Sequence, residues 1–202
     1  MTVIAHKRST ATVVGLLVAV AGFSSCATGP AMHHDRSSPM SYDGGADLPS
    51  TMMTGHAMAT SEQDYLVTMV AHHREAIVAA GQLERSGRPE LRRLGRRIAH
   101  AQAQQVRQMR SWLDRWYWAA PLPAHYQPMM SDLSVLDGDD LDRTFLVEMV
   151  HHHMMAVMMS RQLEHAGLVR HRQVGRFATA VALEQAAEIA LMRRWLTDWE
   201  LR

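Results

Sequence analysis

From Ser61 onward, apolar residues recur every three or four positions, the spacing that places them on one face of an α-helix. Breaks in this pattern predict four helices. Ser61 and the acidic residue three positions later indicate a helix start, and glycine and proline residues mark the later ends and starts. The predicted boundaries are Ser61 to Gly87, Pro89 to the prolines from Pro121 onward, Asp139 or Asp140 to Gly167, and Val169 to Glu200.

The second pair of helices repeats the first. The segment MVAHH at 69–73 aligns with MVHHH at 149–153, and MRSWL at 109–113 aligns with MRRWL at 192–196. A single helical hairpin cannot bury its own apolar face. We therefore predict that repeat one (61–118) and repeat two (139–202) pack into one all-α four-helix bundle spanning 61–202.

The first 60 residues carry a different pattern. A short basic start and an uncharged apolar run at 12–23, too short to span a bilayer comfortably, are typical of a secretory signal. Cys26 follows two serines and resembles the lipidated cysteine of a bacterial lipobox. We predict a signal peptide (1–25) and a lipidated Cys26 at the start of a flexible tether (26–60). The alternative is an ordinary cleaved signal with an incidental cysteine.

Composition narrows the chemistry. The net charge of +1 gives no indication of a nucleic-acid partner. A single cysteine excludes a disulfide framework and any multi-cysteine zinc or iron–sulfur site. The 16 methionines and 13 histidines supply thioether and imidazole groups, which suit copper. Some of them lie in the tether, where they either collect soft metal ions or belong to a plain spacer.

Polar side chains interrupt the apolar faces near the middle of the helices. On a wheel of about 100° per residue, His72 and His152 lie at the edge of the apolar faces, and Glu184 faces inward. A buried charge is costly unless it is paired or bound to metal, so this polar layer is either a hydrogen-bond network that sets helix register or a metal site. Four residues fall near the centres of the faces: His73, Gln105, His153 and Glu188.

Methionines flank the polar layer by one helical turn. Imidazole with thioether favours copper over zinc, magnesium or calcium, although filling gaps in a core is the commoner use of methionine. A di-iron oxidase needs inward Glu-x-x-His pairs. The one such pair, Glu148 and His151, is predicted to face away from the apolar stripe. The flanking methionines are Met69, Met109, Met149 and Met192.

Two motifs of repeat two resemble the domain-of-unknown-function 305 family, and the resemblance extends from about Ser61 to Glu200. It implies a ferritin-like bundle of two similar two-helix repeats in an exported bacterial protein, with no established activity. Gln105 stands where the motif has glutamate, so repeat two is the better candidate site. The motifs read Asp142-x-x-Phe145-x-x-x-Met149-x-x-His152-His153-x-x-Ala156 and Gln185-x-x-Glu188-Ile189-x-x-Met192-x-x-Trp195. The association of some relatives with copper implies the ligand set Met69, His72, His73, Met149, His152, His153 and Met192.

These observations together predict an exported, membrane-anchored lipoprotein that binds or buffers copper outside the cytoplasm. One alternative is a structural or interaction module whose His/Glu layer only sets register. Another is a ferritin-like redox enzyme, which the outward Glu148/His151 pair disfavours. The expected partners are a metal ion and, through the lipid anchor, a membrane, but not nucleic acid.

Overall fold

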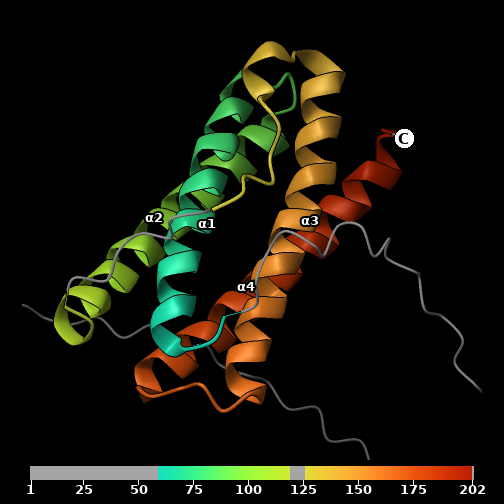
Figure 1. The fold of residues 1–202 in the computed structure, drawn as a ribbon. Helices are drawn as coiled ribbons and strands as arrows, with labels where there is room; N and C mark the ends of the chain where they lie inside the picture. Colours follow the sequence, from blue (N-terminus) through green and yellow to red (C-terminus); the bar gives the residue numbers. More distant parts are fainter. Residues whose placement is uncertain (1–58, 119–125, 202) are drawn as a thin grey trace, which may run out of the picture. The chain divides into compact units, whose positions relative to one another are not determined.

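A computed structural model describes residues 59–118 and 126–201, and within these ranges the chain forms helices and no strand (Figure 1). The predicted all-α four-helix fold is confirmed. None of the described helices is both long and apolar enough to cross a bilayer. The predicted signal peptide, Cys26 and nearly all of the tether lie outside the described residues. The elements are α1 (Glu62–Gln82), η2 (Leu83–Arg85), α2 (Pro89–Trp116), η3 (Leu133–Val135), α3 (Gly138–His165) and α4 (Arg172–Asp198).

Short polar residues start two of the helices. The hydroxyl of Ser61 accepts a hydrogen bond from the backbone N–H of Asp64 at 3.1 Å, which satisfies one free donor at the start of α1 as the sequence predicted. Asp137 has an extended backbone and precedes α3. The expected cap at Asp139 or Asp140 was therefore wrong, because both residues already lie in the first turn of α3, where acidic side chains favour the helix dipole.

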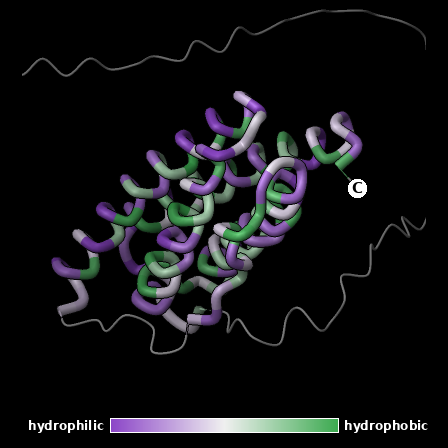
Figure 2. The backbone as a smooth tube through the Cα atoms, turned by 90° about the horizontal axis from the view of Figure 1, so that it is seen from above, coloured by the Kyte–Doolittle hydropathy of each residue, from purple (hydrophilic) through white to green (hydrophobic). Residues whose placement is uncertain are grey.

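The helices form two hairpins. α1 packs closely on α2, α3 packs closely on α4, and the hairpins meet mainly along α1 and α3 (Figure 1). Hydrophilic and hydrophobic stretches alternate along each helix, as amphipathic packing requires (Figure 2). The core consists of two apolar clusters, one on each side of the mid-level of the bundle. The polar layer predicted from the sequence falls between these clusters.

Each hairpin holds the start of the other hairpin's second helix. The buried carboxylate of Glu62, in the first turn of α1, accepts hydrogen bonds from the backbone N–H groups of Arg170 and His171 at 2.6 and 2.8 Å. These residues immediately precede α4. At the equivalent position of α3, buried Asp142 pairs with Arg88 at 2.6 Å, and Arg88 immediately precedes α2. The contact is therefore made twice, once in each direction.

Aromatic side chains repeat the same symmetry. The Trp116 ring at the end of α2 stacks on the imidazole of His171, with centroids 3.8 Å apart and planes 2° from parallel. At the equivalent position near the end of α4, Trp199 lies 5.1 Å from the guanidinium carbon of Arg88. The sequence repeat therefore extends to the contacts between the hairpins.

Gly95 allows α1 and α2 to approach each other closely. A Cβ atom at this position would lie 2.5 Å from the carbonyl oxygen of Ala80 and 3.0 Å from Cβ of Leu83. Backbone cannot move aside without separating the helices, so we expect Gly95→Ala to lower the free energy of unfolding by about 2–3 kcal/mol in urea titrations. The control is Gly81→Ala, where no heavy atom lies within 4 Å. It should be neutral or stabilise by up to about 1 kcal/mol, and equal losses in both variants would contradict the packing argument.

Candidate metal centre

Four histidines gather where α1 packs on α3. His72, His73, His152 and His153 are each at most 1% exposed. The rings of His72 and His152 lie against each other with centroids 3.6 Å apart, and each ring is 6.2 Å from that of its sequence neighbour. The placement of His72 and His152 at the margin was therefore wrong. A helical wheel shows only the main apolar face of a single helix. It does not show that α1 and α3 pack on each other beside these histidines, which buries a second face of each helix.

The second histidine of each adjacent pair, His73 or His153, is held by a polar side chain from the second helix of its own hairpin. His153 Nε2 lies 2.9 Å from a carboxylate oxygen of Glu188, which can only accept, so this nitrogen carries a proton. His73 Nε2 lies 2.8 Å from Oε1 of Gln105, whose amide nitrogen donates to Glu184 at 2.8 Å. The amide oxygen therefore faces His73, and His73 also carries its proton on Nε2. The structure thus brings the predicted layer together as two pairs.

In a neutral imidazole, a proton on Nε2 leaves Nδ1 as a free lone pair, and this is the case for His73. Within the described residues, Nδ1 of His73, Nδ1 of His153 and both ring nitrogens of His72 are buried without a hydrogen-bond partner. Burial lowers the pKa of His73 to about 3, and burial together with the neighbouring imidazole of His152 lowers the pKa of His72 well below its usual value. His72 and His73 are therefore neutral at physiological pH. A neutral imidazole that donates its other N–H to an oxygen is the usual state of a metal-ligating histidine.

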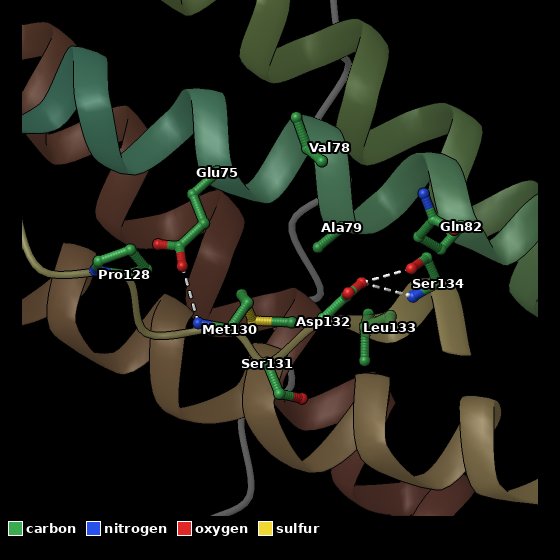
Figure 3. A pocket seen from close by; sticks show the side chains of 10 residues that line it. All are labelled: Glu75, Val78, Ala79, Gln82, Pro128, Met130, Ser131, Asp132, Leu133 and Ser134. Atoms are coloured by element: carbon green, nitrogen blue, oxygen red, sulfur yellow. Dashed lines mark hydrogen bonds between the residues drawn. The ribbon is translucent and has the colours of Figure 1, made fainter. Parts of the chain in front are cut away.

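Glu75 was not singled out from the sequence, yet it organises the other side of the cluster. Its carboxylate lies 3.2 Å from His152 Nε2 and accepts hydrogen bonds from the backbone N–H groups of Met129 and Met130 at 2.6 and 2.7 Å. The hydroxyl of Tyr126 also donates to it. Figure 3 shows Glu75 beside Met130 in a groove of about 390 Å³ between α1 and the segment that leads to α3. Residues 126–131, which we call the covering segment, are therefore tied by Glu75 to the histidine cluster.

Glu184 does not face the interior. It is exposed, and the buried polar side chain of that turn is its neighbour Gln185. Gln105 is only half-buried, whereas Gln102, one turn earlier, is buried. The prediction of an inward Glu184 was wrong. The helix α4 packs mainly against α3 and hardly against α2, so the side of α4 that is buried carries Gln185 and not its neighbour Glu184. Glu184 is instead connected to His73 indirectly, because it accepts a hydrogen bond from the amide of Gln105.

The Glu-x-x-His pair lies on the outside of α3, as predicted. Glu148 accepts hydrogen bonds from the backbone N–H and the hydroxyl of Ser131, at 2.9 and 2.8 Å respectively, and His151 is exposed. Neither side chain belongs to the histidine cluster. Glu148 instead fixes the covering segment that Glu75 also holds.

The four predicted methionines are fully buried. Met69 and Met109 belong to one apolar cluster of the core, and Met149 and Met192 belong to the other, so thioethers flank the histidine layer on both sides. Across residues 59–118 and 126–201, no three His, Cys, Asp or Glu side chains are arranged to hold a metal ion.

The fold and this layer define a two-hairpin helical protein with buried histidines between methionines. The sequence model described as Domain of unknown function (DUF305) matches residues 62–196. The chain belongs to the DUF305 family. Among solved structures, CopM in its Cu(I)-bound form is 30% identical, covers 69% of this chain and 97% of its own, and has a TM-score of 0.62.

Two further structures have comparable similarity. CopM in its silver-bound form, obtained by co-crystallization, is 29% identical over 69% of this chain and 97% of its own, with a TM-score of 0.60. A DUF305 protein from Streptomyces coelicolor, named as a candidate secreted protein, is 28% identical over 68% of this chain and 93% of its own, with a TM-score of 0.59. No curated protein matches the chain.

Proposed function

We propose that this protein binds copper outside the cytoplasm through its buried histidine–methionine layer. The observation that carries the proposal is the set of unpartnered buried nitrogens, namely Nδ1 of His73 and His153 and both ring nitrogens of His72. Burying a donor or acceptor without a partner costs roughly 1–3 kcal/mol, and a metal ion bound to the acceptor nitrogens offsets part of this cost. Soft nitrogen and sulfur donors favour copper. The similarity to CopM, which has been solved with Cu(I), Cu(II) and silver, supports this choice.

The two repeats are unequal in charge, and we place the stronger half of the site in repeat two. Glu188 supplies a negative charge beside His153, whereas Gln105 supplies only a dipole beside His73. A cation in a buried site is stabilised by a nearby carboxylate. The residues that would hold copper are His72, His73, His152 and His153 with Met69, Met109, Met149 and Met192, while Glu188 orients His153. In this role copper is cargo that is held and released.

The test is a copper titration of the chain from Ala59 onward, which omits the His/Met tether. We expect His153→Ala to weaken copper affinity at least tenfold, about 1.4 kcal/mol, in competition with a chelator. Glu188→Gln keeps the shape but removes the charge, and should weaken binding more than Gln105→Leu. The matched control is exposed His100→Ala, which should bind like the unaltered chain. If the unaltered chain binds no more copper than a variant lacking all four clustered histidines, the layer serves only to set helix register.

We also propose that the protein is exported and anchored to a membrane through lipidated Cys26. The basic start, the apolar run and the cysteine of the sequence support this, as does the candidate secreted relative from Streptomyces coelicolor. Replacing Cys26 with alanine should move the protein from the membrane fraction to the soluble fraction of the cell envelope, while the neighbouring Ser25→Ala should not. Undiminished membrane retention of the Cys26→Ala protein would refute the lipid anchor.

A further inference from the structure

The two ends of the bundle differ in how their arginines are used. At one end, where α1 and α4 finish and α2 and α3 begin, most arginines are bonded to carboxylates. We call this the paired end. Its ion pairs, with their N–O distances, are Arg85–Asp137 at 2.6 Å, Arg88–Asp139 at 2.6 Å, Arg88–Asp142 at 2.6 Å, Arg93–Glu90 at 3.0 Å and Arg96–Glu84 at 3.0 Å.

At the opposite end the arginines are free. We call it the tether end, because the described chain enters there at Ala59, just before α1. The last turns of α2 and the start of α4 lie together at this end, since the Trp112 and Phe177 rings are in contact with centroids 5.3 Å apart. Six exposed arginines at this end form no ion pair with a described carboxylate: Arg110, Arg115, Arg161, Arg170, Arg172 and Arg176.

An exposed tryptophan lies beside these charges. Trp118 follows the end of α2 and is 93% exposed, although Trp112 and Trp116 on the same helix are partly buried and stacked on each other. A large aromatic ring exposed next to cationic side chains is costly in water but favourable at the boundary between lipid headgroups and acyl chains. The tether end therefore combines the two side-chain types that recognise a membrane surface.

The course of the chain agrees with this placement. The carbonyl oxygen of Ala59 accepts a hydrogen bond from the side chain of Gln162 at 3.1 Å, which holds Ala59 against the last turns of α3. Three residues later, Glu62 accepts a hydrogen bond from the hydroxyl of Tyr117, next to Trp118, at 2.8 Å. The described chain thus begins at the same end of the bundle as Tyr117 and the start of α4.

We propose that the tether end is a docking face for a membrane surface that carries anionic phospholipid headgroups. This contact is separate from any lipid on Cys26 and from the copper site. A membrane fits better than nucleic acid, because the free charges lie at the same end as an exposed tryptophan, a side chain that favours the headgroup boundary of a bilayer. Each arginine near an anionic leaflet strengthens partitioning about fivefold, so a few of them suffice for weak, reversible docking.

The experiment uses the chain from Ala27 to Arg202, which retains tether and bundle but lacks Cys26. It is sedimented with phosphatidylcholine vesicles that contain or lack phosphatidylglycerol. We expect binding only to the anionic vesicles, weakened by high salt. The double change Arg172→Gln with Arg176→Gln should lower the partition coefficient about 25-fold, and Trp118→Ser should also lower it.

The matched control removes the same charge elsewhere. Arg93→Gln with Arg143→Gln lies towards the paired end and should change the partition coefficient by less than about twofold. Circular dichroism confirms that each variant is folded. Absence of binding to the anionic vesicles, equal binding to neutral vesicles, or equal loss in the control variant would overturn the proposal. Tighter binding to single-stranded DNA than to the vesicles, lost in the Arg172/Arg176 variant, would overturn it in favour of a nucleic-acid face.

Discussion

Acidification from about pH 7 to pH 4 is expected to lower the free energy of unfolding by at least about 3 kcal/mol through two imidazoles alone. Burial holds the pKa of His73 at about 3 and that of His72 well below its usual value. In the unfolded chain both titrate near 6.5. As pH falls below 6.5, the unfolded state therefore takes up protons first, and each pH unit costs up to about 1.4 kcal/mol per imidazole. Above that pH their contribution does not change.

Urea unfolding at a series of pH values measures this effect. In the His73→Leu variant one of the two imidazoles is absent, so the slope of stability against pH below 6.5 should become shallower. Gln105, which loses its partner, is half-buried and can bond water instead. The exposed His100→Leu variant should keep the original slope. An unchanged slope in His73→Leu would mean that His73 is already protonated in the folded protein near neutral pH.

Replacing Glu62 with leucine is expected to destabilise the protein by about 3 kcal/mol or more. Burial alone would raise the pKa of Glu62, but hydrogen bonds from His171, Tyr117 and the backbone of Arg170 hold it below its usual value. Leucine leaves those donors without their acceptor, two of them in the backbone just before α4. Thermal and urea unfolding measure the loss.

The conservative control for this position is Glu62→Gln. A glutamine oxygen can still accept from the backbone N–H groups of Arg170 and His171, so its loss should be smaller by about 1 kcal/mol or more. An equal loss in the leucine and glutamine variants would show that the charge of Glu62 matters and that its hydrogen bonds do not.

The sequence was sufficient to predict the elements whose signals are local. Helical periodicity and the internal repeat predict the four helices, and the wheel predicts that His73 and His153 lie inside, which the structure confirms. The positions of His72 and His152 depend on where α1 packs on α3, which is a tertiary property. The directions of adjacent side chains around a helix axis differ by about 100°. The rotation of a helix about its axis therefore decides which of two neighbours, such as Glu184 and Gln185, is buried and which is exposed.

Glu75 shows a different limit of prediction. Three of its four partners belong to the segment at 126–130, more than 50 residues away in sequence. No periodic pattern records such a contact. The only signal in the sequence is an acidic residue two positions after a buried histidine, at a place where repeat two has Met155. Because the repeats differ here, the carboxylate that holds the covering segment is present in repeat one and replaced by a thioether in repeat two.

The reciprocal contacts between the hairpins do not depend on both hairpins belonging to one chain. Glu62 bonds to the residues before α4, and Asp142 bonds to the residue before α2, whichever molecule supplies them. Two copies that exchange hairpins therefore make the same bonds and complete two histidine layers, as in a domain-swapped dimer. Only the path between α2 and α3 differs between the two forms. The bonds of Glu75 to Met129 and Met130 join α1 to the segment just before α3, so they too are made in both forms and favour neither. The balance between monomer and exchanged dimer is therefore set by the effective concentration at which the connection between α2 and α3 holds the second hairpin.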